Sequence, residues 1–231
     1  MTKLPYPVIK LRESDFLDIE AFRLIDSECD AKFSIPIELT MENAGLNIAR
    51  LATYLVKKND KIIVGVGIGN NGGSGLVAAR RLLSWGYKVY LNIPDKNLKG
   101  LILSQLKRTL ATGATIVSNS KCALFIDAFF GFSQRLPLPD NIAEIIEKEN
   151  HSGSFKLSVD LPSGFSDDIS NIHFKANIIC ALAAPKKELL KYKDNSQMVV
   201  ADIGIPQSLF KKHNIEFNIP FYDSSILEIM N

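Results

Sequence analysis

The stretch that decides the fold reads Ile62-Ile63-Val64-Gly65-Val66-Gly67-Ile68-Gly69-Asn70-Asn71-Gly72-Gly73-Ser74-Gly75. Its first five residues form an apolar run that is typical of a strand buried on both faces of a sheet. Glycines in the following loop let a ligand approach the backbone, and a helix is predicted from about Gly75 to Trp85. Because free amides gather where such a helix begins, the loop favours an anion such as phosphate, with a plain tight turn as the alternative.

Strand and helix patterns alternate outward from this stretch. Two helices are expected before it, one beginning near Ser14 and one running from Pro36 to about Leu55. Further helices are expected at 101–110 and 141–149. Short apolar runs typical of strands occur at 87–91, 114–117, 124–127, 157–160, 177–181 and 198–203. This order predicts an α/β fold with a doubly wound, mostly parallel sheet, helices on both faces and an N-terminal helical pair.

Length and composition narrow the class of protein. A chain of 231 residues fits a single domain over 1–231, and 27 basic against 25 acidic side chains give a net charge of only +2. That balance argues against binding to nucleic acid or to an anionic membrane. Three widely spaced cysteines exclude a disulfide framework and a zinc ribbon. Without an apolar run of about 18 residues or a secretory signal, a cytoplasmic location is expected.

Carboxylates end two of the predicted strands, at Asp127 and Asp160, and Ser163 follows the second. Ligands of doubly wound sheets bind outside the carboxyl ends of the strands, so these residues and Asn71 are expected to meet there. All four carry oxygen donors, which suit a hard cation or the activation of water better than zinc or copper. The alternative for Asp127 is that it only caps neighbouring backbone amides.

Three other classes of enzyme are disfavoured. The loop has no Gly-Lys-Ser/Thr, which argues against a P-loop nucleotidase. Gly67-x-Gly69-x-x-Gly72 matches the dinucleotide fingerprint, but the next strand ends at Leu91-Asn92 and offers no carboxylate for a ribose, which argues against an NAD-dependent dehydrogenase. Ser163 lies outside any Gly-x-Ser-x-Gly elbow and the three histidines fall in expected loops, so a serine hydrolase is also disfavoured.

Short motifs in a fixed order cover nearly the whole chain. They are Ile35-Pro36, Met41-Glu42-Asn43-Ala44-Gly45, the loop and helix from Gly67 to Arg80, Asp127-Ala128-Phe129-Phe130-Gly131, Asp160-Leu161-Pro162-Ser163-Gly164, Ala184-Pro185-Lys186 and Ala201-Asp202-Ile203-Gly204-Ile205-Pro206. Together these motifs resemble the YjeF N-terminal domain family, the NAD(P)H-hydrate epimerases.

The resemblance implies a Rossmann-like fold and an isomerase that repairs damaged nicotinamide cofactors. Such an enzyme interconverts the R and S forms of hydrated NADH and NADPH, called NADHX and NADPHX, at C6 of the nicotinamide ring. A dehydratase that accepts the S form is expected as a separate protein, with no dehydratase domain fused to this chain. A homodimer is also expected, since relatives are often dimers. Loss of the C6 hydroxyl to an iminium-like species and opening of the ring are both permitted routes.

The resemblance also implies the residues of the site. Asp160 is expected to contact the substrate and to act as the catalytic acid and base. Substrate binding is expected at Asn70, Asn71, Gly72, Gly73, Ser74, Gly131, Phe132, Ser133, Gln134, Arg135, Leu136, Pro137 and Asp160. Potassium (K⁺) is the expected cofactor, with Asn71, Asp127 and Ser163 as its ligands.

One residue departs from the family pattern. Ser74 stands where the loop of the family usually has Asp. Serine can cap the helix expected to start there, but a negative charge beside the substrate is lost. Two hypotheses follow: an active epimerase, and a catalytically degenerate module of the same family that binds a nucleotide or a protein. Lys186-Lys187 is interpreted either as a phosphate contact or as a solvated pair.

Overall fold

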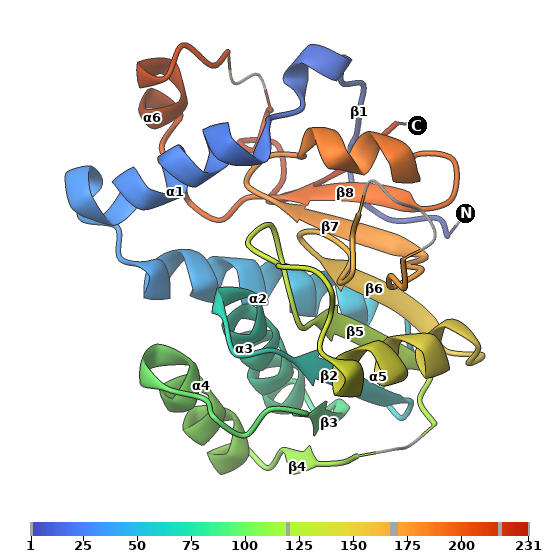
Figure 1. The fold of residues 1–231 in the computed structure, drawn as a ribbon. Coiled ribbons are helices and arrows are strands. Elements are labelled where there is room, and N and C mark those ends of the chain that lie inside the picture. The colour runs from blue at the N-terminus through green and yellow to red at the C-terminus, as the bar shows by residue number, and fades with distance from the viewer. Residues whose placement is uncertain (1, 119–120, 167–170, 217–218, 231) are drawn as a thin grey trace.

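The computed structural model describes residues 2–118, 121–166, 171–216 and 219–230. Within these ranges one sheet holds nine strands (Figure 1). In chain order they are β1 (Val8–Ile9), β2 (Lys61–Val66), β3 (Lys88–Asn92), β4 (Thr115–Ile116), β5 (Leu124–Ala128), β6 (Phe155–Val159), β7 (Ile178–Leu182), β8 (Gln197–Ala201) and β9 (Ile226–Ile229). Across the sheet the order is β1-β9-β8-β7-β6-β5-β2-β3-β4, and every neighbouring pair is parallel except β8 with β9. The predicted mostly parallel sheet is confirmed.

Helices cover both faces of this sheet, as predicted (Figure 1). The helices of the described ranges are α1 (Ile19–Phe33), α2 (Ile37–Thr53), α3 (Asn70–Ser84), α4 (Gly100–Ala111), α5 (Asp140–Asn150), α6 (Gln207–Lys212) and the short 3-10 helices η1 (Glu13–Asp15) and η2 (Lys187–Tyr192). Alternate residues of β5 separate the two cores. Ile126 packs with residues of α2, α3 and α4, whereas Phe125 packs with residues of α5 and η2.

The order of the strands reverses beside β2. The chain runs from β2 outward to β3 and β4, returns to place β5 on the other side of β2, and then continues outward through β6, β7 and β8. In the register of the sheet, Val64 lies between Leu91 and Ile126. A crevice outside the carboxyl ends of the strands forms at such a reversal. The loops after β2, β5 and β6 therefore position the site.

The first helix lies against the segments that follow β7 and β8. Phe22 of α1 shares a buried apolar cluster with Leu209 of α6 and with Ala184, which follows β7. Just before α1, the amide of Leu17 donates a hydrogen bond of 2.9 Å to the carbonyl of Pro185. The start of α1 is thus joined to the same segment of backbone that its side chains cover.

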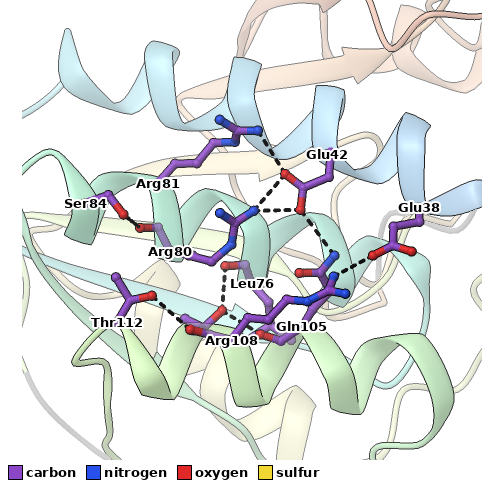
Figure 2. Close-up of polar contacts among 10 residues, drawn as sticks. Glu38, Glu42, Leu76, Arg80, Arg81, Ser84, Gln105, Arg108 and Thr112 are labelled. Carbon is purple, nitrogen blue, oxygen red and sulfur yellow. Dashed lines mark hydrogen bonds and ion pairs between the residues drawn. The ribbon is translucent and has the colours of Figure 1, made fainter.

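Charged side chains join α2, α3 and α4 on one face of the sheet. The carboxylate of Glu42 in α2 accepts hydrogen bonds of 2.6 and 2.9 Å from Arg80 and Arg81 of α3, and one of 3.4 Å from Gln105 of α4 (Figure 2). Burial alone would raise the pKa of Glu42, but the two guanidinium groups lower it overall. This cluster fixes α3, and with it the glycine-rich start of that helix, against its neighbours.

Some boundaries differ from the expected ones. Helix α3 begins at Asn70 and not near Gly75, because glycines in its first turns allow it to pack directly on backbone. Helix α1 begins at Ile19, and the segment near Ser14 forms η1 instead. The sequence patterns also gave no sign of β1 and β9. In the part of the chain that the structure describes, no helix has the length and apolar character needed to cross a membrane.

Candidate active site

A cavity of about 610 Å³ lies at the carboxyl edge of the sheet, beside the reversal of strand order. Its lining comes from the start of α3, from the loops after β5 and β6, and from helices α1 and α2. Aromatic rings from α1 and from segment 129–132 supply much of the surface, and the acidic residues in the described lining are Asp26 and Asp160. A largely apolar cavity of this size with a few convergent polar groups is typical of a small-molecule site.

The start of α3 lies directly against the strand ends. A Cβ on Gly67 would come within 1.8 Å of the carbonyl oxygen of Phe129, and one on Gly72 within 2.0 Å of the carbonyl oxygen of Gly67. Only glycine permits both approaches. The first amides of an α-helix have no acceptor within the helix, so the amides of Asn70 and Asn71 are placed to meet an anion in the cavity.

Ser74 lines the cavity but does not cap the helix. Because α3 begins at Asn70, Ser74 lies within its second turn, and its Oγ donates a hydrogen bond of 3.2 Å to the carbonyl of Asn70. The expectation of a serine cap is therefore wrong. The cause is the early start of α3, which the glycines make possible.

Asp160 is the buried carboxylate of the cavity wall, with 3% of the residue exposed. It directly follows β6 in a left-handed backbone conformation, φ +66°. Its Oδ1 accepts hydrogen bonds from the ammonium of Lys186 and from the amide of Leu182, at 3.4 Å for the latter. Its Oδ2 accepts only the amide of Phe132, at 3.2 Å, in the part of the chain described. One oxygen is thus held by a cation and the other faces the loop that lines the cavity.

Lys186 is completely buried, which overturns the solvated-pair interpretation for this residue. Its Nζ pairs with Asp160, donates a hydrogen bond of 2.8 Å to the carbonyl of Leu182 and lies 4.0 Å from the centre of the Phe22 ring. The neighbouring Lys187 is exposed and pairs with Asp18 at 3.0 Å. A buried lysine is stable only when paired, so Lys186 and Asp160 form one unit.

Asp127 is also completely buried, but its partners carry no charge. The hydroxyl and amide of Ser163 donate to it at 2.6 and 2.8 Å, and the hydroxyl of Ser158 and the amide of Phe129 donate at 3.3 Å. Burial raises the pKa of Asp127 to about 6, although these hydrogen bonds act against the rise. A cation beside this carboxylate would be stabilised by it.

Asn71 joins the two strand-end loops to the start of α3. Its Nδ2 donates hydrogen bonds of 2.6 and 3.2 Å to the carbonyls of Phe130 and Val159. The amide of the same Phe130 donates to the Oγ of Ser163 at 3.1 Å. The three residues expected to bind potassium are thus linked through the backbone of Phe130, with carboxylate, amide, hydroxyl and carbonyl oxygens close together. Neither Asp127 nor Ser163 is among the residues that line the large cavity, so this cluster lies beside it.

Most residues expected to bind substrate line the cavity. They are Asn70, Asn71, Ser74, Gly131, Phe132, Ser133, Gln134, Arg135, Pro137 and Asp160. Gly72 and Gly73 pack against the Gly67 carbonyl and the Met41 side chain, and Leu136 is 41% exposed; none of the three is among the lining residues. Substrate contacts at all these positions stay predictions.

The family follows from comparison with known proteins. The family model described as YjeF-related protein N-terminus matches residues 38–188, which is more than half of the chain. The chain belongs to this family. The match includes the start of α3 and the loops that hold Asp127, Asp160 and Lys186.

Relatives of this family member have names that describe a common activity. A bifunctional NAD(P)H-hydrate repair enzyme of Thermofilum pendens is 31% identical over 87% of this chain, which spans only 43% of that protein. NAD(P)H-hydrate epimerases of Anopheles darlingi and Elusimicrobium minutum are 30% and 32% identical, over 88% and 84% of this chain and 93% and 97% of theirs. The crystal structure of yeast ynu0 matches with a TM-score of 0.80 and 22% identity, over 92% of this chain and 99% of that one, which confirms the expected fold.

Helix α1 of this YjeF-family chain supplies cavity residues that were not expected from its sequence. Phe22 and Asp26 come from α1, four residues apart and so on one face of the helix, and both line the cavity. Nothing in the pattern of α1 separates them from the residues of an ordinary amphipathic helix. A signal did exist for Lys186, since it follows a predicted strand at the edge where Asp160 also lies.

Proposed function

We propose that this chain is an NAD(P)H-hydrate epimerase, an isomerase that interconverts the R and S forms of NADHX and NADPHX at C6 of the nicotinamide ring. The observation that carries the proposal is the carboxylate of Asp160, held by Lys186 in the wall of a cavity of small-molecule size. Membership of the family and the names of the two epimerases, which this chain covers almost completely, support it.

The chemistry of the substrate explains why a carboxylate is needed. C6 carries the hydroxyl and is bonded to N1, so loss of the hydroxyl leaves a cation that the lone pair of N1 stabilises. Water then returns to either face of C6. Asp160 takes a proton from this water and returns it in the reverse direction, as a general base and acid. Its Oδ2 has room for this role, because Oδ1 holds the contact with Lys186. Ring opening, the second route, needs the same proton transfer.

A potassium ion fits the cluster of Asn71, Asp127 and Ser163. Asp127 is a buried carboxylate with only neutral donors among the described residues, and hard oxygen donors surround it. Those three residues would hold the ion, with the nearby carbonyl of Phe130. The ion would supply positive charge beside the start of α3 and would fix the loops after β5 and β6. The homodimer, the separate dehydratase and the cytoplasmic location stay predictions from the sequence.

The test is an epimer-exchange assay. R-NADHX freed of the S form is incubated with the protein in potassium buffer, and S-NADHX is measured by chromatography. Formation of S-NADHX well above the spontaneous rate is expected, and Asp160→Asn should abolish most of it. Thermal denaturation of that variant shows whether it is folded, since the substitution leaves Lys186 without its carboxylate.

Background exchange by the natural chain would contradict the epimerase. If the chain still bound the hydrate, the degenerate binding module that Ser74 suggests would replace the proposal. A gain of activity in Ser74→Asp would then identify the missing carboxylate as the cause.

A further inference from the structure

The proposed reaction needs a proton for the departing hydroxyl as well as a base for the incoming water, because hydroxide is a poor leaving group. Asp160 faces the cavity with one oxygen and keeps the other on Lys186. A second acidic residue of the described cavity lining is Asp26 of α1. It comes from a different element and has a different environment.

Asp26 lies where two cavities meet. Its side chain lines the large cavity together with Asn70 and Ser74, and it also lines a second cavity of about 190 Å³. The second cavity is bounded by Asp30, which is exposed, so Asp26 has a path for exchanging protons with solvent. No hydrogen bond to the Asp26 carboxylate is found in residues 2–118, 121–166, 171–216 and 219–230. Its oxygens are therefore available to a ligand in the large cavity.

The charges around Asp26 differ from those around Asp160. Asp160 forms a direct ion pair with Lys186, and Asp26 does not. Burial raises the pKa of Asp26, Lys186 lowers it, and the charge of Asp160 raises it again, with a net rise. Two further titratable groups line the second cavity with Asp26. One is the thiol of Cys29, whose own pKa is raised by burial and by the charge of Asp26, and the other is the exposed carboxylate of Asp30. A buried carboxyl group whose pKa is raised keeps its proton to a higher pH than a solvated one does, which suits a proton donor.

Backbone contacts hold α1 in position for this role. Leu17 forms an isolated parallel bridge with Lys186: its amide donates to the carbonyl of Pro185 and its carbonyl accepts from the amide of Lys187, both at 2.9 Å. The ring of Phe22, one turn before Asp26, lies 4.0 Å from the Lys186 ammonium. Asp26, Lys186 and Asp160 are therefore placed relative to one another by backbone and not only by side chains.

We propose that Asp26 is a second catalytic carboxylate, which protonates the C6 hydroxyl as the C6–O bond breaks. This inference rests on the proposed epimerase function. The proton of Asp26 moves to the hydroxyl oxygen, the C6–O electron pair leaves with that oxygen as water, and the N1 lone pair forms the N1=C6 bond. Water then adds to C6, its spare proton goes to Asp160, and the N1=C6 electrons return to N1. One proton has moved from Asp26 to Asp160, and the reverse epimerisation or exchange with solvent restores the starting state.

The test compares Asp26→Asn with the matched control Glu20→Gln. Both variants remove one carboxylate from α1, but Glu20 is exposed and lines neither cavity. Asp26→Asn is expected to lower kcat for epimer exchange about 100-fold, with KM changed less than about threefold. Activity of the natural chain should fall as pH rises and Asp26 loses its proton. Asp26→Asn should lose this alkaline fall, and Asp26→Glu should restore it. Glu20→Gln should behave like the natural chain.

Two results would overturn the inference. One is a folded Asp26→Asn protein with kcat within about twofold of the natural chain. The other is a loss confined to KM, with the alkaline fall retained, which would make Asp26 a binding residue. Both require an active natural chain, so they differ from failure of the proposed function itself, in which the natural chain shows only background exchange. That failure would overturn both proposals.

Discussion

The cavity has two walls that are built differently. The inner wall consists of strand-end residues and the start of α3, and its carboxylate, Asp160, is paired with a buried lysine in a backbone conformation fixed by the sheet. The outer wall consists of α1, and its carboxylate, Asp26, lies between two cavities without an ion-pair partner in the described residues. The comparison shows how a bonded cation divides the two proposed roles: the carboxylate paired with Lys186 is held ionised to accept a proton, whereas the unpaired carboxylate of Asp26 can donate one.

The strongest test of the inner wall is Lys186→Met. Removal of one partner leaves the Asp160 charge buried and unpaired, so we expect a loss of about 3–5 kcal/mol in the free energy of unfolding. The double variant Lys186→Met/Asp160→Asn should recover much of this loss, because it buries no net charge. Urea denaturation measures both. Equal stability of the single and double variants would show that the two side chains do not act as a pair.

A second test concerns the backbone of the inner wall. Gly72→Ala places a Cβ against the carbonyl of Gly67 and should cost about 1–3 kcal/mol of stability by overpacking. The matched control is Gly69→Ala in the same loop, where a Cβ meets nothing within 4 Å and the backbone is extended. The control replaces the N-cap glycine of α3 by a poorer capping residue but also restricts the unfolded chain, and these effects oppose each other, so the stability should change by less than about 1 kcal/mol. Similar Tm values for the two variants would contradict the close approach.

Potassium should distinguish Asp160 of the inner wall from Asp127, which lies beside the cavity. At tenfold its Kd, bound potassium should stabilise the chain by about 1.4 kcal/mol and raise Tm by about 3–5 °C over the same ionic strength of choline. Asp127→Asn should abolish this difference, since it removes the only charged residue of the predicted potassium ligands. Lys186→Met/Asp160→Asn should keep it. A potassium effect that survives Asp127→Asn would place the ion elsewhere.

The smallest change in Tm is expected from a substitution in an exposed ion-pair cluster of α1. Glu28 of α1 pairs with Lys32 and with Lys212 of α6, and these ammonium groups lower its pKa to about 2. Because the pKa is lowered in the folded chain, the contribution is present above the unfolded value near 4.5 and is lost as pH falls toward 2. Exposed pairs contribute little, so Glu28→Gln should lower Tm by at most ~2 °C at pH 7. A large drop would show that α6 fixes α1 and hence the outer wall.

The inner wall could be predicted from the sequence because polar residues stand at the ends of its apolar strand patterns. A carboxylate that ends an apolar run, as at Asp127 and Asp160, is conspicuous, and the sheet brings such ends to one edge. The glycines after β2 indicated a loop in the sequence. Their close packing against neighbouring backbone, which lets α3 begin at Asn70, could be seen only in the structure. The pairing of Lys186 with Asp160 joins two strand ends, and no local pattern encodes that distance.

The outer wall could not be predicted for the opposite reason. Asp26 is one of several charged residues on α1, and most of the others are exposed. Asp26 differs from the other charged residues of α1 because it lines the cavity, and this position depends on the bridge between Leu17 and Lys186 that holds the helix there. The same limit applies to β9, a short segment whose antiparallel pairing with β8 depends on the path of the chain and not on its own composition.

The two edge strands of the sheet affect how readily copies of the chain aggregate. Among the described residues, the outermost strands β1 and β4 have only two residues each. A long unpaired edge would offer a row of free amides and carbonyls on which another chain can add a strand. These edges offer almost none, although the strands inside are rich in the residues that aggregate most readily. The folded chain is therefore protected from edge-to-edge polymerisation, and concentrated solutions should stay free of fibrils until the sheet itself opens.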